Sequence, residues 1–139
     1  MSKYNTNLAS EFHVLSILHR LGVDANLTLG NKKTVDIIVT NDEGDVITID
    51  VKGIAKKYDW PADNIRAPKS GKHFVVLVSY EGKIEDSSFG PKVWVIPHKK
   101  TKRFIKQYRT RKNVSRSLVT KQGKEFLNAW DLISNPGED

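Results

Sequence analysis

The stretch Thr34–Gly53 constrains the fold of this chain more than any other, because apolar and polar residues alternate along most of it. The alternation predicts two β-strands, Val35–Thr40 and Val46–Lys52, joined by the turn-rich run Asn41–Asp45. Successive side chains of a strand point to opposite faces. One face of the hairpin therefore carries only β-branched apolar residues and belongs to a core: Val35, Ile37, Val39, Ile47, Ile49 and Val51.

The other face of the hairpin brings two carboxylates together. If the whole turn is unpaired, Ile38 lies opposite Thr48 and Asp36 lies opposite Asp50, with Lys52 two residues beyond. Like charges placed directly opposite each other destabilise a sheet by roughly 0.2–1 kcal/mol. A bound cation relieves that repulsion, so this register predicts a metal site. A slip by two residues keeps both acids on this face but separates them, and the sequence leaves that alternative open.

A helix is expected over Leu8–Leu21, with Asn7 or Thr6 as its N-cap and Gly22 as its C-terminal stop. At about 100° per residue its apolar side chains gather on one side. That predicted apolar face consists of Leu8, Phe12, Val14, Leu15, Ile17, Leu18 and Leu21.

Glu11 does not follow this helical pattern, because it projects near the middle of the apolar face. Burying a carboxylate there costs several kcal/mol unless it is paired or metal-bound. A position at the rim of the core near the helix start, weakly favoured by the helix dipole, is the alternative. Because Asp36 and Asp50 need a third partner, we expect Glu11 to complete the metal site.

The remaining elements suggest one α/β domain over residues 1–139, with a mixed central β-sheet flanked by helices. Strands are expected at Val23–Gly30, His73–Tyr80 and Lys92–Ile96, and helices at Thr101–Lys112 and Lys121–Ile133, with a frayed tail from Ser134 to Asp139. Ile54–Lys72 is expected to be a long irregular loop over the carboxylate face. Its Trp60 is predicted either to stack on nucleic-acid bases or to pack the loop against the core.

The charge distribution indicates a polyanionic partner. The net charge is +7, and no acidic residue occurs between Ser87 and Lys124. A solvated basic face is the ordinary explanation, but the length and single sign of this segment favour nucleic acid over a membrane surface. The residues predicted to contact nucleic acid are Lys99, Lys100, Lys102, Arg103, Lys106, Arg109, Arg111, Lys112 and Arg116, together with Trp60.

The remaining composition narrows the chemistry and the location. The chain has no cysteine, which excludes disulfides and thiolate metal sites. No stretch is apolar enough for a membrane span or a secretory signal, so a soluble cytoplasmic protein is expected. Its four histidines have no convincing ligand spacing and are expected to be structural or on the surface.

Hard oxygen ligands and a neighbouring lysine indicate metal-dependent phosphodiester cleavage. Asp36 and Asp50 are predicted to hold Mg²⁺ (or Mn²⁺), with Glu11 reaching the ion directly or through water. Such an ion polarises the phosphate and activates the attacking water. Lys52 is predicted to orient or deprotonate that water, or to stabilise the developing charge.

The order of these residues along the chain resembles that of a known nuclease superfamily. A helix with a glutamate, a strand with an aspartate, a hairpin and then Asp-x-Lys (Asp50-Val51-Lys52) together resemble the PD-(D/E)XK nuclease superfamily, which includes restriction endonucleases and archaeal Holliday-junction resolvases. The resemblance covers Leu8–Gly53, and Val35 departs from it where many members have proline. It implies a restriction endonuclease-like core, metal binding by Glu11, Asp36, Asp50 and the Val51 carbonyl, and a catalytic Lys52.

The preferred hypothesis is therefore a magnesium-dependent DNA endonuclease, acting on structured or branched DNA and working as a homodimer because so small a domain offers limited contact surface. Two alternatives remain open. One is a nucleic-acid-binding module without catalysis on the same fold. The other is a partner subunit of a restriction or mobile-element system.

Overall fold

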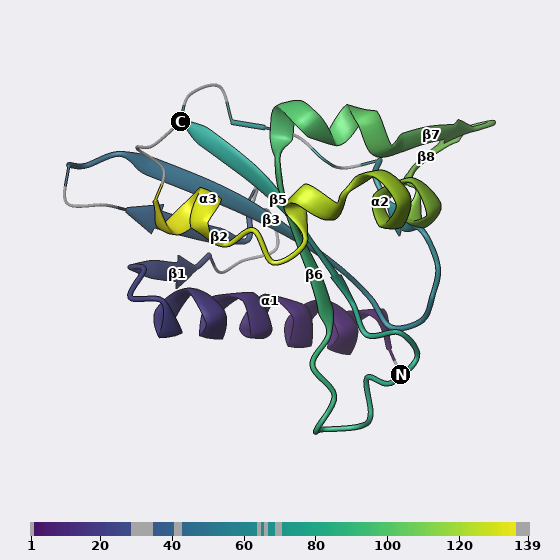
Figure 1. The fold of residues 1–139 in the computed structure, drawn as a ribbon, viewed down its shortest axis with the longest axis horizontal. Coiled ribbons are helices and arrows are strands. Elements are labelled where there is room, and N and C mark those ends of the chain that lie inside the picture. The colour runs from purple at the N-terminus through teal and green to yellow at the C-terminus, as the bar shows by residue number, and fades with distance from the viewer. Residues whose placement is uncertain are drawn as a thin grey trace.

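A mixed β-sheet forms the centre of the computed structural model, which describes residues 2–28, 35–40, 43–63, 65, 67–68 and 71–135. Its five strands lie in the order β1-β2-β3-β5-β6 (Figure 1). They are β1 (Ala25–Leu27), β2 (Ile37–Thr40), β3 (Val46–Ile54), β5 (Lys72–Ser79) and β6 (Lys92–Pro97). β3 and β5 are parallel, and the other neighbours are antiparallel. The predicted mixed sheet with helices on both faces is confirmed.

The hairpin of β2 and β3 has the predicted register. Ile38 pairs with Thr48, and Ile37 pairs with Ile49. Ile49 is the last residue of β3 that pairs with β2, although β3 continues to Ile54. The carboxyl end of β3 therefore extends beyond the paired part of β2. The turn Asn41–Asp45 lies partly outside the described residues, as does the carboxyl end of the predicted strand Val23–Gly30.

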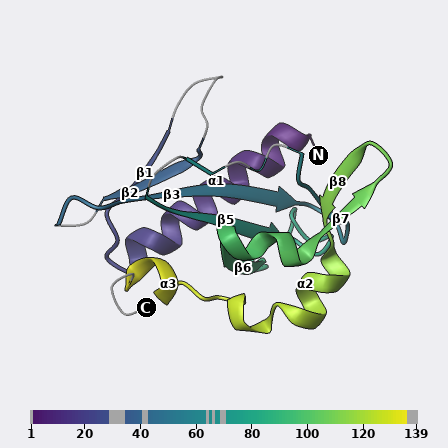
Figure 2. The same ribbon diagram turned by 90° about the horizontal axis from the view of Figure 1, so that it is seen from above.

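The helix α1 (Lys3–Arg20) covers the apolar face of this hairpin (Figure 2). It begins five residues before the predicted start, because the Ser2 hydroxyl rather than Asn7 or Thr6 caps it by accepting from the Asn5 amide at 3.1 Å. Its buried residues are spaced four apart: Thr6, Ser10, Val14 and Leu18.

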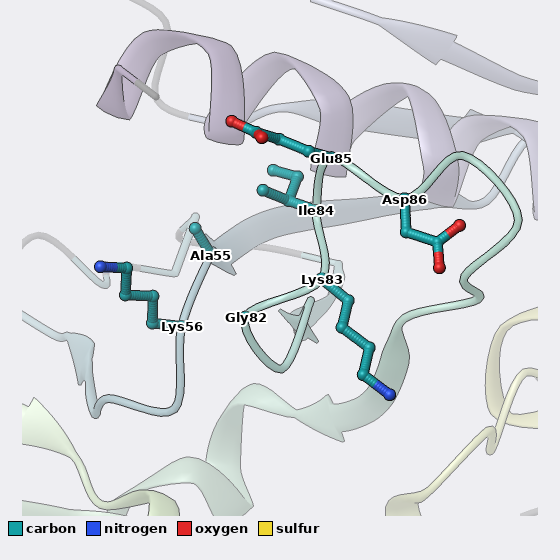
Figure 3. Close-up of a pocket in the computed structure, with 7 residues that line it drawn as sticks. All are labelled: Ala55, Lys56, Gly82, Lys83, Ile84, Glu85 and Asp86. Carbon is teal, nitrogen blue, oxygen red and sulfur yellow. The ribbon is translucent and has the colours of Figure 1, made fainter.

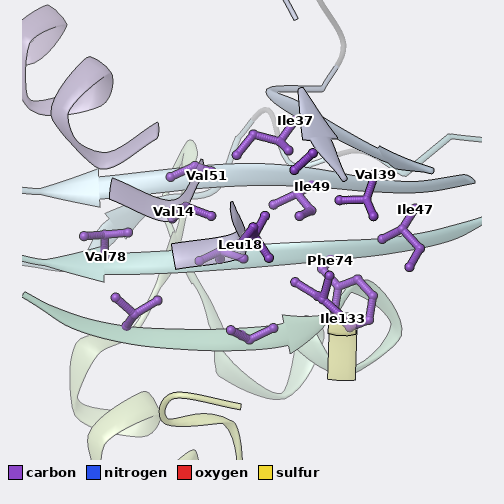
Figure 4. Packing of buried hydrophobic residues seen from close by; sticks show 14 of the residues in the cluster. Val14, Leu18, Ile37, Val39, Ile47, Ile49, Val51, Phe74, Val78 and Ile133 are labelled. Carbon is purple, nitrogen blue, oxygen red and sulfur yellow. The ribbon is translucent and has the colours of Figure 1, made fainter. Parts of the chain in front are cut away.

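The predicted apolar face of α1 is partly wrong. Phe12 and Leu21 remain 54% and 50% exposed. The residues of α1 that face the sheet instead follow the four-residue spacing that starts at Thr6. Two small polar residues, Thr6 and Ser10, therefore occupy the first half of this interface. In the second half, Val14 and Leu18 pack against Ile37, Ile49 and Val51 of the hairpin, as Figure 4 shows.

The opposite face of the sheet is covered by a second hydrophobic cluster. Val75 and Leu77 of β5 and Trp94 of β6 pack there against Phe104 and Val119. Phe104 ends η1 (His98–Phe104), and Val119 lies in α2 (Arg116–Gln122). Both elements lie on the side of the sheet opposite to α1 in Figures 1 and 2.

The predicted helix Thr101–Lys112 is wrong. After η1 the chain forms β7 (Ile105–Tyr108) and β8 (Arg111–Val114), which pair as an antiparallel hairpin. β4 (Trp60–Pro61), which lies in the predicted loop Ile54–Lys72, adds to β8 and completes a second sheet in the order β4-β8-β7. The basic residues of this segment have no acidic partner at helical spacing, whereas the sheet buries Val114 and Trp60.

The predicted helix Lys121–Ile133 is also wrong. α2 ends at Gln122, and at the next residue, Gly123, an added Cβ would lie 2.6 Å from the Val119 carbonyl oxygen. A short 3₁₀ turn η2 (Lys124–Phe126), a bridge from Leu127 to Trp94 and the short helix α3 (Asp131–Ser134) follow. Asn128, at φ 54°, turns the chain between them. Across the described part of the chain, no helix is long and apolar enough to cross a membrane.

Candidate functional site

The candidate site lies where β3 extends beyond β2 and α1 crosses over it. Gly53 permits this crossing, because a Cβ there would lie 2.7 Å from the Ser10 Cβ and even closer to the Ser10 hydroxyl. Ser10 is fully buried, and its hydroxyl donates to the Thr6 carbonyl at 2.7 Å. The close approach fixes the start of α1 against β3, and it brings Glu11, the residue after Ser10, to the edge of the hairpin.

A pocket of about 230 Å³ opens at this edge. Asp36 lies within it just before β2, and its Oδ2 accepts a hydrogen bond from the Val51 amide at 2.7 Å. The N–H and C=O groups of one strand residue leave the strand on the same side, so the Val51 carbonyl also faces this edge. The pocket is lined by Lys3, Asn7, Glu11, Asp36, Val51, Lys52, Gly53 and Pro61.

Four sequence-predicted residues therefore line one pocket. Glu11, Asp36 and Lys52 are each half-buried, so they are shielded and still reachable from solvent. Together with the Val51 carbonyl, the two carboxylates offer hard oxygen donors of the kind that Mg²⁺ prefers. The lysine supplies a positive charge at the same place.

Asp50 does not join them, because it is 5% exposed and its Oδ2 lies 3.2 Å from His73 Nε2. The other ring nitrogen of His73 lies 2.7 Å from the Thr48 hydroxyl. Residues 48 and 73 pair directly across β3 and β5, which sets the histidine beside the aspartate. Among the described residues no three carboxylates or histidines lie close enough to hold a metal together, so the predicted three-carboxylate cradle is not formed here.

A second histidine extends the Asp50 cluster. The His98 ring lies 5.4 Å from the His73 ring, and its Nδ1 is buried without a hydrogen-bond partner among the described residues. Burial lowers the pKa of His98, the neighbouring His73 lowers it further, and Asp50 acts in the opposite direction. The sequence predicted a structural or surface role for these histidines but gave no sign that His73 contacts Asp50, because that contact depends on the parallel pairing of β3 and β5.

Three residues predicted to contact nucleic acid are already engaged within the protein. Trp60 is fully buried, packs edge-on against Trp94 at 5.8 Å, and donates from Nε1 to the Val78 carbonyl at 3.2 Å. It therefore packs the loop against the core, as the alternative interpretation predicted, and does not stack on bases.

Arg116 and Arg103 also have partners of their own. The Arg116 guanidinium binds Glu81, donates to the Ser79 hydroxyl at 2.8 Å and stays 16% exposed. Arg103 pairs with Glu125 at 3.2 Å on the surface. Arg116 thus anchors the start of α2 to the sheet, which is a structural role that corrects the prediction of nucleic-acid contact.

The other basic residues remain exposed in two groups. Lys99, Lys100 and Lys102 belong to η1, and Lys106, Arg109, Arg111 and Lys112 belong to the β7–β8 hairpin.

Another pocket, of about 520 Å³, lies between the end of β3 and the connection from β5 to β6. Figure 3 shows that its charged side chains, Lys56, Lys83, Glu85 and Asp86, point in different directions and do not converge on one point. None of the sequence-predicted site residues lines it, so it offers no comparable site.

Comparison with known proteins identifies the class of fold. The chain has a restriction endonuclease-like α/β fold, so the resemblance to the PD-(D/E)XK superfamily is confirmed at the level of the fold. A bacterial homing endonuclease, I-Ssp6803I, shares it with a TM-score of 0.59 over 98% of this chain and 94% of that one. The sequence identity is 18%, so the likeness concerns the fold alone. No protein-family model and no curated protein sequence matches the chain.

Proposed function

We propose that this protein is a metal-dependent endonuclease that hydrolyses phosphodiester bonds in DNA, with structured or branched DNA among its substrates. One observation carries the proposal: Glu11, Asp36, Val51 and Lys52 line a single pocket. The fold that the chain shares with a homing endonuclease supports it independently. The exposed lysines and arginines of η1 and the β7–β8 hairpin support a nucleic-acid substrate.

The donors in the pocket fit Mg²⁺ or Mn²⁺. The carboxylates of Glu11 and Asp36 and the carbonyl of Val51 would hold the ion. When bound, it supplies Lewis-acid polarisation of the phosphate and a more acidic water. Lys52 stabilises the negative charge that develops on the phosphate or orients the attacking water. Asp50 remains a proposed ligand, although its contact with His73 separates it from the pocket in this structure.

Two copies of the chain would act together on duplex DNA. A single pocket of this kind faces one strand, so cutting both strands in one binding event needs a second pocket. We therefore propose a homodimer, which the sedimentation coefficient with and without a duplex or four-way junction would test.

The contact between Asp50 and His73 favours a second candidate, a DNA-binding module without catalysis. In that case Asp50 serves only as a buried partner of His73, and DNA binding survives its replacement. The two candidates differ in one measurement, the cleavage of DNA in the presence of Mg²⁺.

The test is nicking of supercoiled plasmid, fork and four-way-junction DNA by wild type and by Asp36→Asn, Asp50→Asn and Lys52→Ala. The control is Glu85→Ala, which removes an exposed acid that does not line the candidate pocket. We expect Asp36→Asn and Lys52→Ala to slow cleavage about 100-fold or more without weakening DNA binding. Glu85→Ala should cleave at the wild-type rate. Equal cleavage by all variants would exclude catalysis by this pocket. Binding without cleavage by wild type would establish the module instead.

A further inference from the structure

The β7–β8 hairpin projects from the body of the molecule as a two-stranded ribbon (Figure 1). Its base is anchored, because Val114 is buried and pairs with both Ile105 and Trp60. From residue 106 to residue 112 every side chain is exposed. The outer part of the ribbon contributes no side chain to the core, so its side chains are accessible to a partner.

The two faces of the ribbon differ. Residues paired across antiparallel strands share a face, so Lys106, Tyr108 and Arg111 lie on one side. Gln107 and Lys112 lie on the other, the side on which Val114 is turned toward the core. The first face is therefore the outer one, and it presents two cations and an aromatic ring (46% exposed). The Asp63 carboxylate contacts the ribbon at Lys112, whose backbone amide donates to it at 2.9 Å.

The tip of the ribbon carries an arginine in an unfavourable backbone conformation. The turn consists of Arg109 and Thr110, and Arg109 has φ 47°, which glycine or asparagine adopts at lower cost. The Gln107 side chain donates to the Arg109 carbonyl at 3.1 Å and supports the turn. Such backbone strain is concentrated at functional positions, so a cation at the tip is a second sign of a contact surface.

The ribbon starts beside the candidate pocket. Pro61 lines that pocket and pairs with Asn113 of β8, which in turn pairs with Lys106 of β7. Neighbouring strands lie about 5 Å apart, so Lys106 is about 10 Å from Pro61 across the sheet. In both views the hairpin and the start of α1 lie at the same end of the molecule (Figures 1 and 2). DNA held with a phosphate at the pocket is therefore within reach of the ribbon.

We propose that the β7–β8 ribbon enters the major groove of duplex DNA and that its outer face reads base edges. The major groove of B-DNA is about 12 Å wide and 8.5 Å deep and admits a two-stranded ribbon. From Ile105 to Tyr108 the ribbon extends about 10 Å, which matches that depth. Arg111 and Lys106 are suited to the acceptors of guanine, and Tyr108 gives apolar contact with the thymine methyl group. Arg109 and Lys112 contact the flanking phosphates.

This inference rests on the proposed DNA substrate and is specific to the double-stranded form. The major groove of an RNA duplex is too deep and narrow for side chains to read, so the ribbon would gain nothing from RNA.

The test selects bound sequences from a random DNA duplex library in EDTA, then maps where methylation of guanine N7, which lies in the major groove, blocks binding. We expect an enriched sequence and interference at one or more guanines. Arg111→Ala should remove interference at a guanine and reduce the preference for the selected over a scrambled duplex about 10-fold or more. Lys124→Ala, which removes an exposed cation outside the hairpin, should change neither.

Arg109→Gly gives a second measurement that does not depend on Arg111. It should weaken binding to both duplexes, because it removes a positive charge. It should not lower the melting temperature, because glycine adopts the positive φ of this turn without strain. No enriched sequence, interference that is identical in wild type and Arg111→Ala, or tighter binding of duplex RNA would each overturn the proposal. Binding is measured in EDTA and does not need cleavage, so the two proposals can fail separately. Methylation interference without nuclease activity would refute only the proposed reaction. Cleavage without interference would refute only the proposed entry of the ribbon into the major groove.

Discussion

Replacement of Gly53 by alanine tests how the candidate pocket is assembled. An added Cβ would lie 2.7 Å from the Ser10 Cβ and 3.3 Å from the Thr6 carbonyl oxygen. Non-bonded carbon atoms pack at about 3.5–4.0 Å, so α1 has to move away from β3. Ser10 is fully buried and hydrogen-bonded, which leaves its side chain no space to yield.

The expected cost of Gly53→Ala is about 2–3 kcal/mol of unfolding free energy, in the upper part of the range for overpacked cores. Ser10→Gly by itself costs about 1–2 kcal/mol, from the lower helix propensity of glycine and the lost hydrogen bond. In the double variant the clash with Ser10 is gone. Its stability should therefore be close to that of Ser10→Gly alone, a favourable coupling of about 2 kcal/mol. Ser10→Ala keeps the Cβ and should rescue little.

Urea denaturation followed by tryptophan fluorescence measures these free energies. Gly90→Ala is the matched control, because a Cβ at Gly90 meets nothing within 4 Å and its φ lies outside the left-handed region. It should change stability by less than about 0.5 kcal/mol. DNA cleavage should fall in Gly53→Ala as well, because the displaced helix moves Glu11 away from Asp36.

Two results would refute this reasoning. One is a Gly53→Ala protein as stable as the Gly90→Ala control. The other is a rescue by Ser10→Ala as large as that by Ser10→Gly, which would place the clash somewhere other than the Ser10 Cβ.

Three residues elsewhere in the molecule give further predictions. Trp60→Ala should lower the unfolding free energy by about 3–5 kcal/mol in urea titrations, because Trp60 is fully buried; a loss below 1 kcal/mol would contradict its role as an anchor. Burial raises the pKa of Glu81, but the hydrogen bond from Lys92 and the charge of Arg116 outweigh it, so its pKa lies below the ordinary 4.5. The stability that ionised Glu81 contributes is complete above about pH 4.5 and is lost as the pH falls through its folded-state pKa. Glu81→Gln should therefore make the unfolding free energy fall less steeply at acidic pH. An unchanged dependence on pH would argue against the ion pair. Lys112→Ala should make the slope of log binding constant against log salt concentration about 1 unit shallower, measured by fluorescence anisotropy with a labelled duplex; an unaltered slope would remove Lys112 from the phosphate contacts.

The faces of the β2–β3 hairpin could be read from the sequence because one of them is entirely apolar and β-branched. Shifting either strand by one residue would expose that face, so burial excluded a one-residue slip, and the tertiary structure selected the pairing of Ile38 with Thr48 over a slip by two residues. The same pattern placed Lys52 near Asp36, whereas the Val51 carbonyl was expected from the resemblance to the PD-(D/E)XK superfamily. Glu11 was found for a related reason, since a carboxylate among apolar helix positions stands out.

The second half of the chain was harder to predict. Its cations alternate with few apolar residues, so neither a two-residue nor a helical period dominates between Lys99 and Lys112. The hairpin there forms because β8 gains a distant partner, β4, some 50 residues earlier in the chain. A local sequence pattern does not predict a pairing between segments so far apart in the chain.

The sequence by itself therefore determined the hairpin, its buried face and the polar groups that lie along its edge, because alternation and burial act between near neighbours. Only the tertiary structure decided which of those groups meet in the pocket and which pair elsewhere. The parallel pairing of β3 with β5 sets His73 beside Asp50, and the close contact of Gly53 with Ser10 brings Glu11 to Asp36. Both depend on which distant segments meet, and this is fixed only when the whole core packs.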